Sequence, residues 1–357
     1  MEKLSINFND RKNFIIVGHG LISDLKEIIK NNKCFFIVDK FIYENHYDKY
    51  FYEIFKDVDR NSIYLFDSKE ENKDIEKALS IIECLTKENY LRDSILVSIG
   101  GGVIGDIAGF VSSIYMRGIK FINIPTTLLA QIDSSIGGKN AVNFKNNKNL
   151  IGTFKHPEKI IIDTNFLSTI SKRELISGLV EVIKYGIVFE SGFLNYINDN
   201  LKKILSLERE VIENVILKSC EFKVKVIEKD EYDFSLRKVL NFGHTIGHAL
   251  ESVTQYSLYT HGEAVLIGMF YETCIAYELS IISKEYFDYI VGILRKFKIG
   301  IDVSIFKKSC FYEALLRDKK NRMNKISFIL PIGFSKVSEY LFSLDEIKKI
   351  NYARYCF

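Results

Sequence analysis

Only three prolines, Pro125, Pro157 and Pro331, interrupt the 357 residues, and no glycine- or serine-rich tract separates one part of the chain from another. Flexible linkers between independent domains are rich in such residues. Their scarcity argues against loosely tethered modules. We therefore expect domains that pack tightly against each other, with a cleft between them.

The sequence also has little that indicates disulfide bonds, secretion or a one-signed charged face. The six cysteines include no Cys-x-x-Cys pair, and nothing resembling a signal peptide begins the chain. Free thiols in a reducing cytoplasm are therefore expected. The net charge of +3 forms no basic stripe, and the least charged long stretch, 94–132, still contains charged residues. Neither nucleic acid nor a membrane is expected as a partner.

The hydrophobic pattern changes character near Thr164. Before it, short apolar runs such as "FFIVD", "SILVSIG", "KFINIPT" and "KIIIDT" alternate with helical patterns, which is typical of a parallel α/β sheet. After it, segments such as "RELISGLVEVIKYGIVF" carry apolar residues at helical spacing. The length is large for one core. We predict an α/β domain over residues 1–164 and a mainly helical domain over residues 165–357.

A glycine-rich turn lies within the first half, in "SIGGGVIGDIAGF". Gly100, Gly102 and Gly105 satisfy the pattern G-x-G-x-x-G, in which glycines let backbone N–H groups approach a phosphate at a helix N-terminus. The match follows a middle strand, and no acidic residue stands about twenty positions on, where a dinucleotide fold places its ribose ligand. The pattern alone fits either a nucleotide site or a tight turn.

A polar segment follows, "PTTLLAQIDSSIGGKNAVNFKNNKNLIGTF", with Lys139, Lys145 and Lys148 spread through it. Small residues with ammonium groups suit a polyanionic small molecule, whereas the other interpretation is a solvated loop. Its length favours function, because long ordered loops tend to be functional.

Three of the six histidines, His244, His248 and His261, stand close together in the second half. The first two are four residues apart and share a helix face, but Thr245 replaces the glutamate of a zinc protease motif. Three histidines, or two with a carboxylate, suit a catalytic zinc ion. Helix spacing alone would pair His244 with His248. Glu181 and Lys184, three residues apart, fit either a surface ion pair or a site.

Several long motifs together resemble 3-dehydroquinate synthase, in the same order and spacing. They are "SIGGGVIGDIAGFVSSIYMRGIKFINIPTTLLAQIDSSIGGKNAVN", "KNLIGTF", "SGLVEVIKYG", "LRKVLNFGHTIGHALE" and "HGEAV". The resemblance is dense between residues 94 and 268. It implies an α/β nucleotide-binding domain with a parallel sheet, followed by a mainly α-helical metal-binding domain, with the active site between them.

The resemblance also implies a reaction. The enzyme would convert 3-deoxy-D-arabino-heptulosonate 7-phosphate to 3-dehydroquinate and phosphate, as a carbon–oxygen lyase of the shikimate pathway. It would use Zn²⁺, or Co²⁺ in its place, and NAD that is reduced and reoxidised in each turnover. The partners it implies are a sugar-phosphate substrate and a second copy of the chain.

Site residues carry over from the resemblance position by position. Those implied for the metal are Glu181, His244 and His261. Those implied for NAD are Asp39, Glu70, Lys73, Gly100, Gly101, Gly102, Asp106, Thr126, Thr127, Asp133, Lys148, Asn149, Phe166 and Thr169. Those implied to act on the substrate are Lys139, Lys184, Lys223, Arg237, Asn241, His248 and, from the neighbouring subunit, Arg117. Asn149 also matches a substrate contact.

The sequence departs from the family pattern in two places. "FDSKEENK", which holds Glu70 and Lys73, lacks the usual proline and glycine. "RDKKNRMNKISFIL" has Asn324 where glycine is usual, a position where asparagine tolerates the left-handed backbone, and either Lys319 or Lys320 would meet the substrate.

Three other functions remain as alternatives. A metal-dependent polyol or glycerol dehydrogenase shares the architecture, but its first metal ligand is commonly aspartate, and it has no need of Lys223 and Arg237 for a substrate carboxylate. A sugar-phosphate cyclase whose substrate lacks a carboxylate is disfavoured by the same two cations. A non-catalytic nucleotide-binding homologue would have lost metal or phosphate residues, and none is lost at the matched positions.

Overall fold

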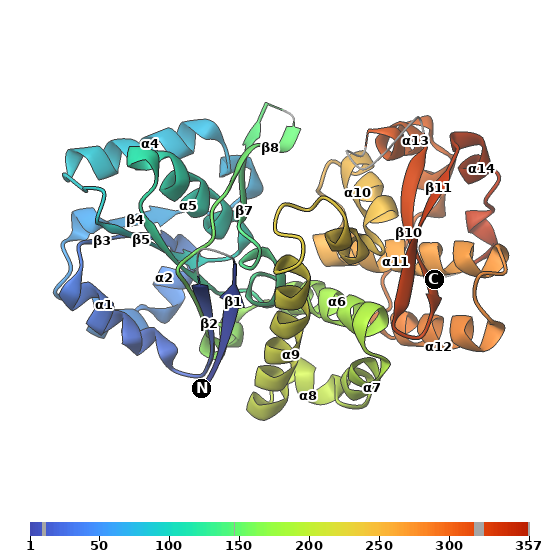
Figure 1. Ribbon diagram of the computed structural model, residues 1–357, viewed down its shortest axis with the longest axis horizontal. Coiled ribbons are helices and arrows are strands. Elements are labelled where there is room, and N and C mark those ends of the chain that lie inside the picture. Colours follow the sequence, from blue (N-terminus) through green and yellow to red (C-terminus); the bar gives the residue numbers. More distant parts are fainter. Residues whose placement is uncertain (9–11, 146, 318–324, 356–357) are drawn as a thin grey trace. The chain divides into compact units, whose positions relative to one another are not determined.

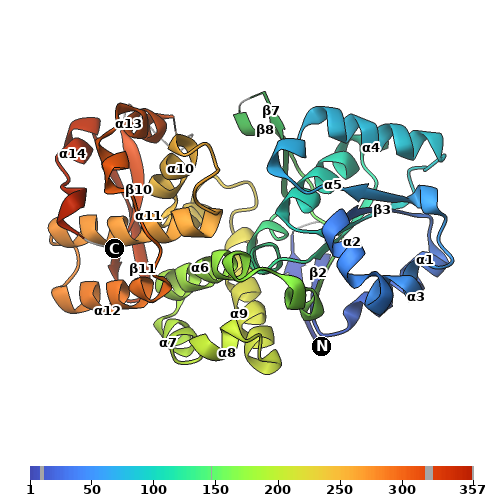
Figure 2. The same cartoon turned by 180° about the vertical axis from the view of Figure 1, so that it is seen from behind.

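The computed structural model describes residues 1–8, 12–145, 147–317 and 325–355 (Figure 1, and from behind in Figure 2). The chain forms two units. Unit 1 comprises Met1–Ser171 and Leu207–Tyr232, and unit 2 comprises Lys172–Ser206 and Asp233–Phe357. No helix of the described residues combines the length and apolar composition needed to cross a membrane.

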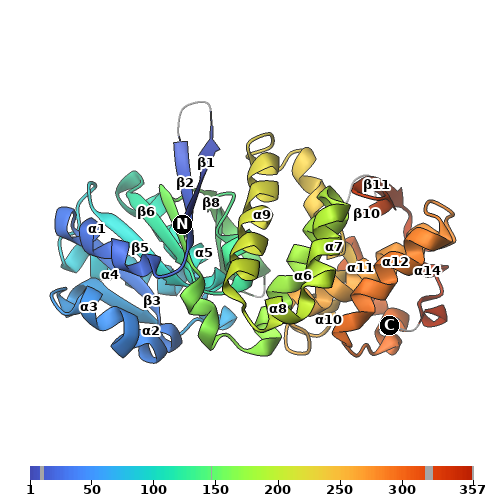
Figure 3. The same ribbon diagram turned by 90° about the horizontal axis from the view of Figure 1, so that it is seen from below.

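A seven-stranded sheet forms the centre of unit 1. Its strands, in spatial order, are β1 (Glu2–Asn7), β2 (Lys12–Gly18), β9 (Lys159–Asp163), β6 (Lys120–Pro125), β5 (Ile95–Gly100), β3 (Cys34–Asp39) and β4 (Ile63–Phe66). All neighbours pair in parallel except β1 and β2, which pair antiparallel at one edge (Figure 3). Every residue of β3 and β5 is buried, as expected for strands covered on both faces. The predicted parallel α/β sheet is confirmed.

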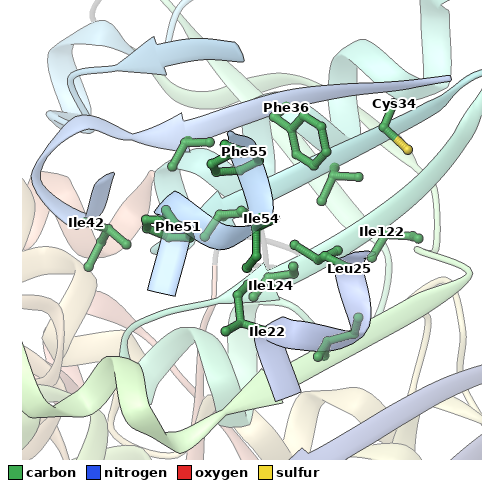
Figure 4. Packing of buried hydrophobic residues seen from close by; sticks show 14 of the residues in the cluster. Ile22, Leu25, Cys34, Phe36, Ile42, Phe51, Ile54, Phe55, Ile122 and Ile124 are labelled. Carbon is green, nitrogen blue, oxygen red and sulfur yellow. The ribbon is translucent and has the colours of Figure 1, made fainter. Parts of the chain in front are cut away.

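Helices cover both faces of this sheet. The helices are α1 (Leu25–Asn31), α2 (Lys40–His46) and α3 (Tyr52–Phe55) on one face, and α4 (Ile75–Lys87) and α5 (Gly102–Ile114) on the other. Successive residues of a strand point to opposite faces. Accordingly, Phe36 packs with Phe51 and Ile122 in the first core (Figure 4), whereas Phe35 packs with Leu96 in the second.

Two further pieces complete unit 1. The polar segment forms an antiparallel hairpin of β7 (Lys139–Phe144) and β8 (Asn147–Phe154), and the sequence alone did not identify these strands. The long helix α9 (Arg209–Ile227) belongs to unit 1 although it follows Thr164. It packs against β1, β2 and the short helical segment Ala130–Ser134.

Unit 2 is mainly helical, as predicted. Its helices are α6 (Lys172–Phe189), α7 (Ser191–Asp199), α8 (Leu201–Leu205), α10 (His244–Val253), α11 (His261–Glu278), α12 (Lys284–Leu294), α13 (Ser309–Leu316) and α14 (Leu344–Lys348). A hairpin of β10 (Ile326–Gly333) and β11 (Lys336–Phe342) packs beside α11 (Figure 2). From Gly262 to Ala276 every residue of α11 except Glu263 is buried, so α11 is the central helix of the unit.

Candidate functional site

Three helices of unit 2 bring together one carboxylate and two imidazoles. Glu181 lies in the middle of α6, and His244 and His261 are the first residues of α10 and α11. One ligand atom from each residue lies within 4.8 Å of the other two. Nε2 of His244 and Nε2 of His261 are 3.7 and 3.8 Å from Oε1 of Glu181. We call these residues the triad.

The carboxylate of the triad is in a costly position. Glu181 is 0% exposed in the middle of α6, where most of the neighbouring residues are apolar. Its ion-pair partner one turn later is Lys184, itself only 1% exposed. Removing this charged pair from water carries a desolvation cost that one ion pair repays only in part. A divalent cation among one carboxylate oxygen and two imidazoles would relieve that cost, so the donor set fits a zinc-type metal ion.

His244 is held in place by a buried carboxylate on α11. Glu272 is fully buried, and its Oε2 accepts the backbone N–H of Gly243 at 2.6 Å. The backbone of Gly243 is left-handed, with φ of 80°, a conformation that glycine adopts without strain. A side chain at Gly268 would lie 1.8 Å from the Gly243 carbonyl oxygen, so α10 and α11 approach closely because that residue is glycine.

His261 is held by the cap of α11. Thr260 and Glu263 form a capping box at the start of this helix. Arg173, at the start of α6, donates two hydrogen bonds to the Glu263 carboxylate, at 2.9 and 2.6 Å. Burial would raise the pKa of Glu263, but hydrogen bonds from Arg173 and Thr260 lower it below its ordinary value. The ion pair thus joins the starts of the helices that carry Glu181 and His261.

His248 lies beside the triad rather than within it. Its ring centroid is 5.3 Å from that of His244 and 6.2 Å from that of His261. Among the described residues, only Glu181, His244 and His261 form a group able to hold a metal ion. Helix spacing would have paired His244 with His248, whereas the structure brings together the three residues implied by the resemblance.

The residues expected to bind NAD lie in unit 1, around the carboxyl edge of the parallel sheet. Asp39 ends β3, Gly100 ends β5, and Thr126 follows β6. The N–H of Thr126 donates to the carbonyl of Gly100 at 3.0 Å, which fixes the glycine turn against the next strand. Gly102 then begins α5, whose N-terminus can receive a phosphate.

A buried lysine connects four more of the expected NAD residues. Lys73 is 2% exposed, and its ammonium donates to Asp106 at 2.9 Å and to Asn149 at 2.7 Å. Its distance to the Glu70 carboxylate is 3.4 Å, and Lys148 lies 3.7 Å from the same side chain. Burial would lower the pKa of Lys73, but Asp106 and Glu70 raise it above its ordinary value. The lysine therefore stays charged and holds this polar group together.

The remaining expected NAD residues are placed as follows. The Asp133 carboxylate forms an ion pair with the Lys223 ammonium of α9, with 2.6 Å between Nζ and Oδ1. Phe166 is buried in the first core, and the Thr169 hydroxyl is 2.8 Å from Nε2 of His46. Thr127 lies against Gly101, where a side chain would meet its methyl group at 3.2 Å.

The residues expected to bind phosphate and carboxylate are divided between the units. Lys139, the first residue of β7, lies in unit 1, as does Lys223, whereas Arg237 and Asn241 lie in unit 2 within the short segment Leu236–Asn241. Arg237 is buried. Lys319, Lys320 and Asn324 lie outside the described residues.

Sequence reasoning missed four side chains that support the site: Arg173, Glu251, Glu272 and Ser68. The Ser68 hydroxyl donates to Asp39, and Glu251 contacts His261. Only Glu251 left a signal in the sequence, because it follows His244 by seven residues and so shares its helix face.

Residues 63–177 match the family described as 3-dehydroquinate synthase N-terminal, and residues 178–321 match 3-dehydroquinate synthase C-terminal. A 3-dehydroquinate synthase of Alkaliphilus metalliredigens is 43% identical over 353 residues, covering 99% of both chains. Another, from a Thermoanaerobacter species, is 41% identical and covers 98% of this chain and 99% of the relative.

Solved structures are similar to the chain over nearly its full length. A 2-deoxy-scyllo-inosose synthase complexed with carbaglucose-6-phosphate, NAD⁺ and Co²⁺ has a TM-score of 0.83 and 25% identity, covering 98% of both chains. A 2-epi-5-epi-valiolone synthase from Streptomyces hygroscopicus, with NAD⁺ and Zn²⁺ bound, has a TM-score of 0.84 and 21% identity, covering 96% of both. A probable glycerol dehydrogenase from Sinorhizobium meliloti, at 15% identity, a TM-score of 0.60 and 94% coverage of both, shares the fold.

Substitution Gly262→Ala should disrupt the triad. The new methyl group would lie 2.2 Å from the carbonyl oxygen of Ser177, so α11 would have to move away from α6 and carry His261 from Glu181. We expect weaker zinc binding and a loss of about 1–3 kcal/mol in the free energy of unfolding. Gly292→Ala on α12 is the control, because nothing lies within 4 Å of its added methyl group. Zinc titration and denaturant unfolding would measure both effects. Wild-type zinc affinity in Gly262→Ala would contradict the expectation.

Proposed function

The chain belongs to the 3-dehydroquinate synthase family, and we infer from that premise how its residues convert 3-deoxy-D-arabino-heptulosonate 7-phosphate to 3-dehydroquinate and phosphate. The reaction is a phosphate-eliminating cyclisation, a carbon–oxygen lyase step of the shikimate pathway. The observation that carries the assignment of residues is the fully buried carboxylate of Glu181, facing two imidazole nitrogens.

We propose that Glu181, His244 and His261 bind Zn²⁺, or Co²⁺ in its place, and that NAD binds at the carboxyl edge of the sheet in unit 1. The donor atoms of the triad support the first proposal, and the glycine turn and the N-terminus of α5 support the second. When bound, the metal ion would act as a Lewis acid towards substrate hydroxyl oxygens, and NAD would take up a hydride and return it.

We propose that His248 moves a proton at a substrate hydroxyl oxygen. Two features support this: it lies one turn beyond His244, and its ring faces the triad residues without belonging to the ligand set. Imidazole can act as acid or base near neutral pH. Lys184 would donate a hydrogen bond to a substrate oxygen beside the metal, because its ammonium is already held next to Glu181.

The phosphate and carboxylate of the substrate would be bound by cations and amides, namely Lys139, Lys223, Arg237, Asn149 and Asn241. Two of these side chains are restrained before substrate arrives: Asp133 fixes the Lys223 ammonium, and Arg237 is buried. Restrained cations orient a dianionic group at little entropic cost. The role of these five residues is thus to orient the substrate, while the substrate's own phosphate takes up the proton that is lost on elimination.

The dehydrogenase alternative is less well supported. The first ligand of the triad is glutamate, and the two cations suited to a substrate carboxylate, Lys223 and Arg237, are present. The similarity to the glycerol dehydrogenase rests on 15% identity, against 43% for the synthase of Alkaliphilus metalliredigens.

We also propose a homodimer and a cytoplasmic location. Arg117 is exposed, with φ of 63°, directly after Met116 with φ of 48°. Such backbone conformations are strained and persist where surrounding structure requires them. An arginine held outward in this way could reach the phosphate bound by a neighbouring subunit. Five cysteines of the described chain are free thiols, in keeping with a reducing compartment.

Alanine variants of the four site residues should separate metal binding from proton transfer. We expect Glu181→Ala, His244→Ala and His261→Ala to lose tight zinc binding and activity, because each removes one of three ligands. His248→Ala should keep close to one zinc per subunit while its turnover falls by roughly 10²–10⁴-fold. Elemental analysis and phosphate-release kinetics measure both. If His248→Ala loses zinc while His261→Ala retains it, the ligand assignment is wrong.

Activity should require NAD only in substoichiometric amounts, because the hydride is returned to the same substrate molecule. The measurement is phosphate release from the heptulosonate phosphate at limiting NAD, with absorbance at the NADH wavelength followed in parallel. We expect many turnovers per NAD and no build-up of NADH. NADH formed in step with product would instead favour the dehydrogenase.

Arg117→Ala should raise KM and lower kcat, because each charge-assisted contact to a phosphate is worth roughly 1.5–3 kcal/mol. Mixing it with a Lys139→Ala subunit tests whether the contact crosses subunits. In a mixed dimer one site would have both Lys139 and a partner's arginine. Random reassortment would then restore about a quarter of wild-type activity, since half the dimers are mixed and each has one working site. No recovery would contradict sharing.

A further inference from the structure

We propose that Glu251 is a positioning residue that orients His261 for metal binding. The proposal rests on the metal site proposed above and adds to it a side chain outside the proposed ligand set. Glu251 lies in the last turn of α10, and its Oε1 is 3.2 Å from Nδ1 of His261.

The imidazole of His261 lies between two carboxylates. Its Nδ1 faces Glu251, and its Nε2 lies 3.8 Å from Oε1 of Glu181. The two nitrogens are on different sides of the ring, so Glu251 contacts the nitrogen that the metal would not use. Glu251 is also outside the group whose ligand atoms lie within 4.8 Å of one another. It therefore acts through His261.

The hydrogen bond selects one form of the ring. A neutral imidazole carries one N–H and one lone pair. If Nδ1–H donates to Glu251, the lone pair is on Nε2 and points towards Glu181. The negative charge of Glu251 also makes the imidazole a stronger metal ligand.

His244 obtains the same orientation in a different way. Its Nδ1 lies 3.1 Å from the backbone carbonyl oxygen of Phe242, which leaves Nε2 to face Glu181 at 3.7 Å. A backbone carbonyl cannot be removed by substitution. The contact of His261 with Glu251 is made by a side chain, so there the effect can be tested by mutation.

Burial and the place of Glu251 in its helix both disfavour a negative charge there. Its side chain is buried, with 5% of the residue exposed, and it stands two residues before the end of α10 at Val253. A carboxylate in the last turn of a helix is repelled by the partial negative charge of the helix C-terminus. The interaction with His261, and through it with a bound cation, offsets part of this cost.

The test compares Glu251→Ala and Glu251→Gln with wild type in the full-length chain. Glu278→Gln is the control, since it changes a carboxylate at the far end of α11, 17 residues from His261. Zinc affinity is measured by competition with a chelator. The ligand field is measured from the visible spectrum of the Co²⁺-loaded protein, and thermal unfolding is measured on metal-free protein.

We expect Glu251→Ala to weaken zinc binding by about 10–100-fold and to shift the Co²⁺ bands at full occupancy. Glu251→Gln should weaken it less, because its amide oxygen still accepts Nδ1–H. Glu278→Gln should bind zinc as wild type does, and the metal-free variants should unfold near the wild-type temperature.

Two results would overturn the proposal. One is wild-type zinc affinity in Glu251→Ala while Glu181→Ala and His261→Ala lose zinc. The proposed ligand set would then hold, and the role of Glu251 would be refuted. The other is a large loss of stability in metal-free Glu251→Ala with unchanged zinc affinity, which would make Glu251 a structural residue. If His261→Ala itself keeps zinc, the proposed ligand set fails first, and the orientation by Glu251 fails with it.

Discussion

The buried carboxylate of Glu181 is the constraint on which the arrangement of unit 2 depends. A charge without exposure to water must be matched by fixed partners, and here they come from three helices: Lys184 on α6 itself, His244 on α10 and His261 on α11. The close contacts made possible by Gly262 and Gly268 bring those helices near enough to supply them. The packing of α6, α10 and α11 and the pairing of the Glu181 charge therefore require the same arrangement of these helices.

In unit 1, Lys73 is likewise a buried charge that depends on fixed partners. Its ammonium is buried beside the glycine turn and is matched by Asp106, Glu70 and the amide of Asn149. Glu70 lies in the short turn Glu70–Asn72 before α4, Asp106 in α5 and Asn149 in β8, so one cation connects three parts of unit 1. A rigid, pre-paired surface of this kind suits a cofactor that must be held without rearrangement.

Much of this could be predicted from the sequence, and the exceptions have physical reasons. The strands β3 and β5 are fully buried and read as continuous apolar runs, so the parallel sheet was predictable. The strand β8 is mostly exposed, so it lacks the apolar pattern by which strands are recognised. The membership of α9 in unit 1 depends on which surface its apolar face meets, and helical periodicity does not specify that. The three residues of the triad were implied by the resemblance to the family, whereas helix spacing alone would have paired His244 with His248.

The supporting side chains were less accessible because their contacts join residues distant in sequence. Glu272 reaches Gly243 across 29 positions, and Arg173 reaches Glu263 across 90. The most direct test of the account is a crystal structure of the zinc-loaded protein, with anomalous scattering measured on both sides of the zinc edge. It should show one peak in unit 2, about 2.0–2.2 Å from a Glu181 oxygen and from Nε2 of His244 and of His261. A peak bound by His248, or by Nδ1 of His261, would contradict it.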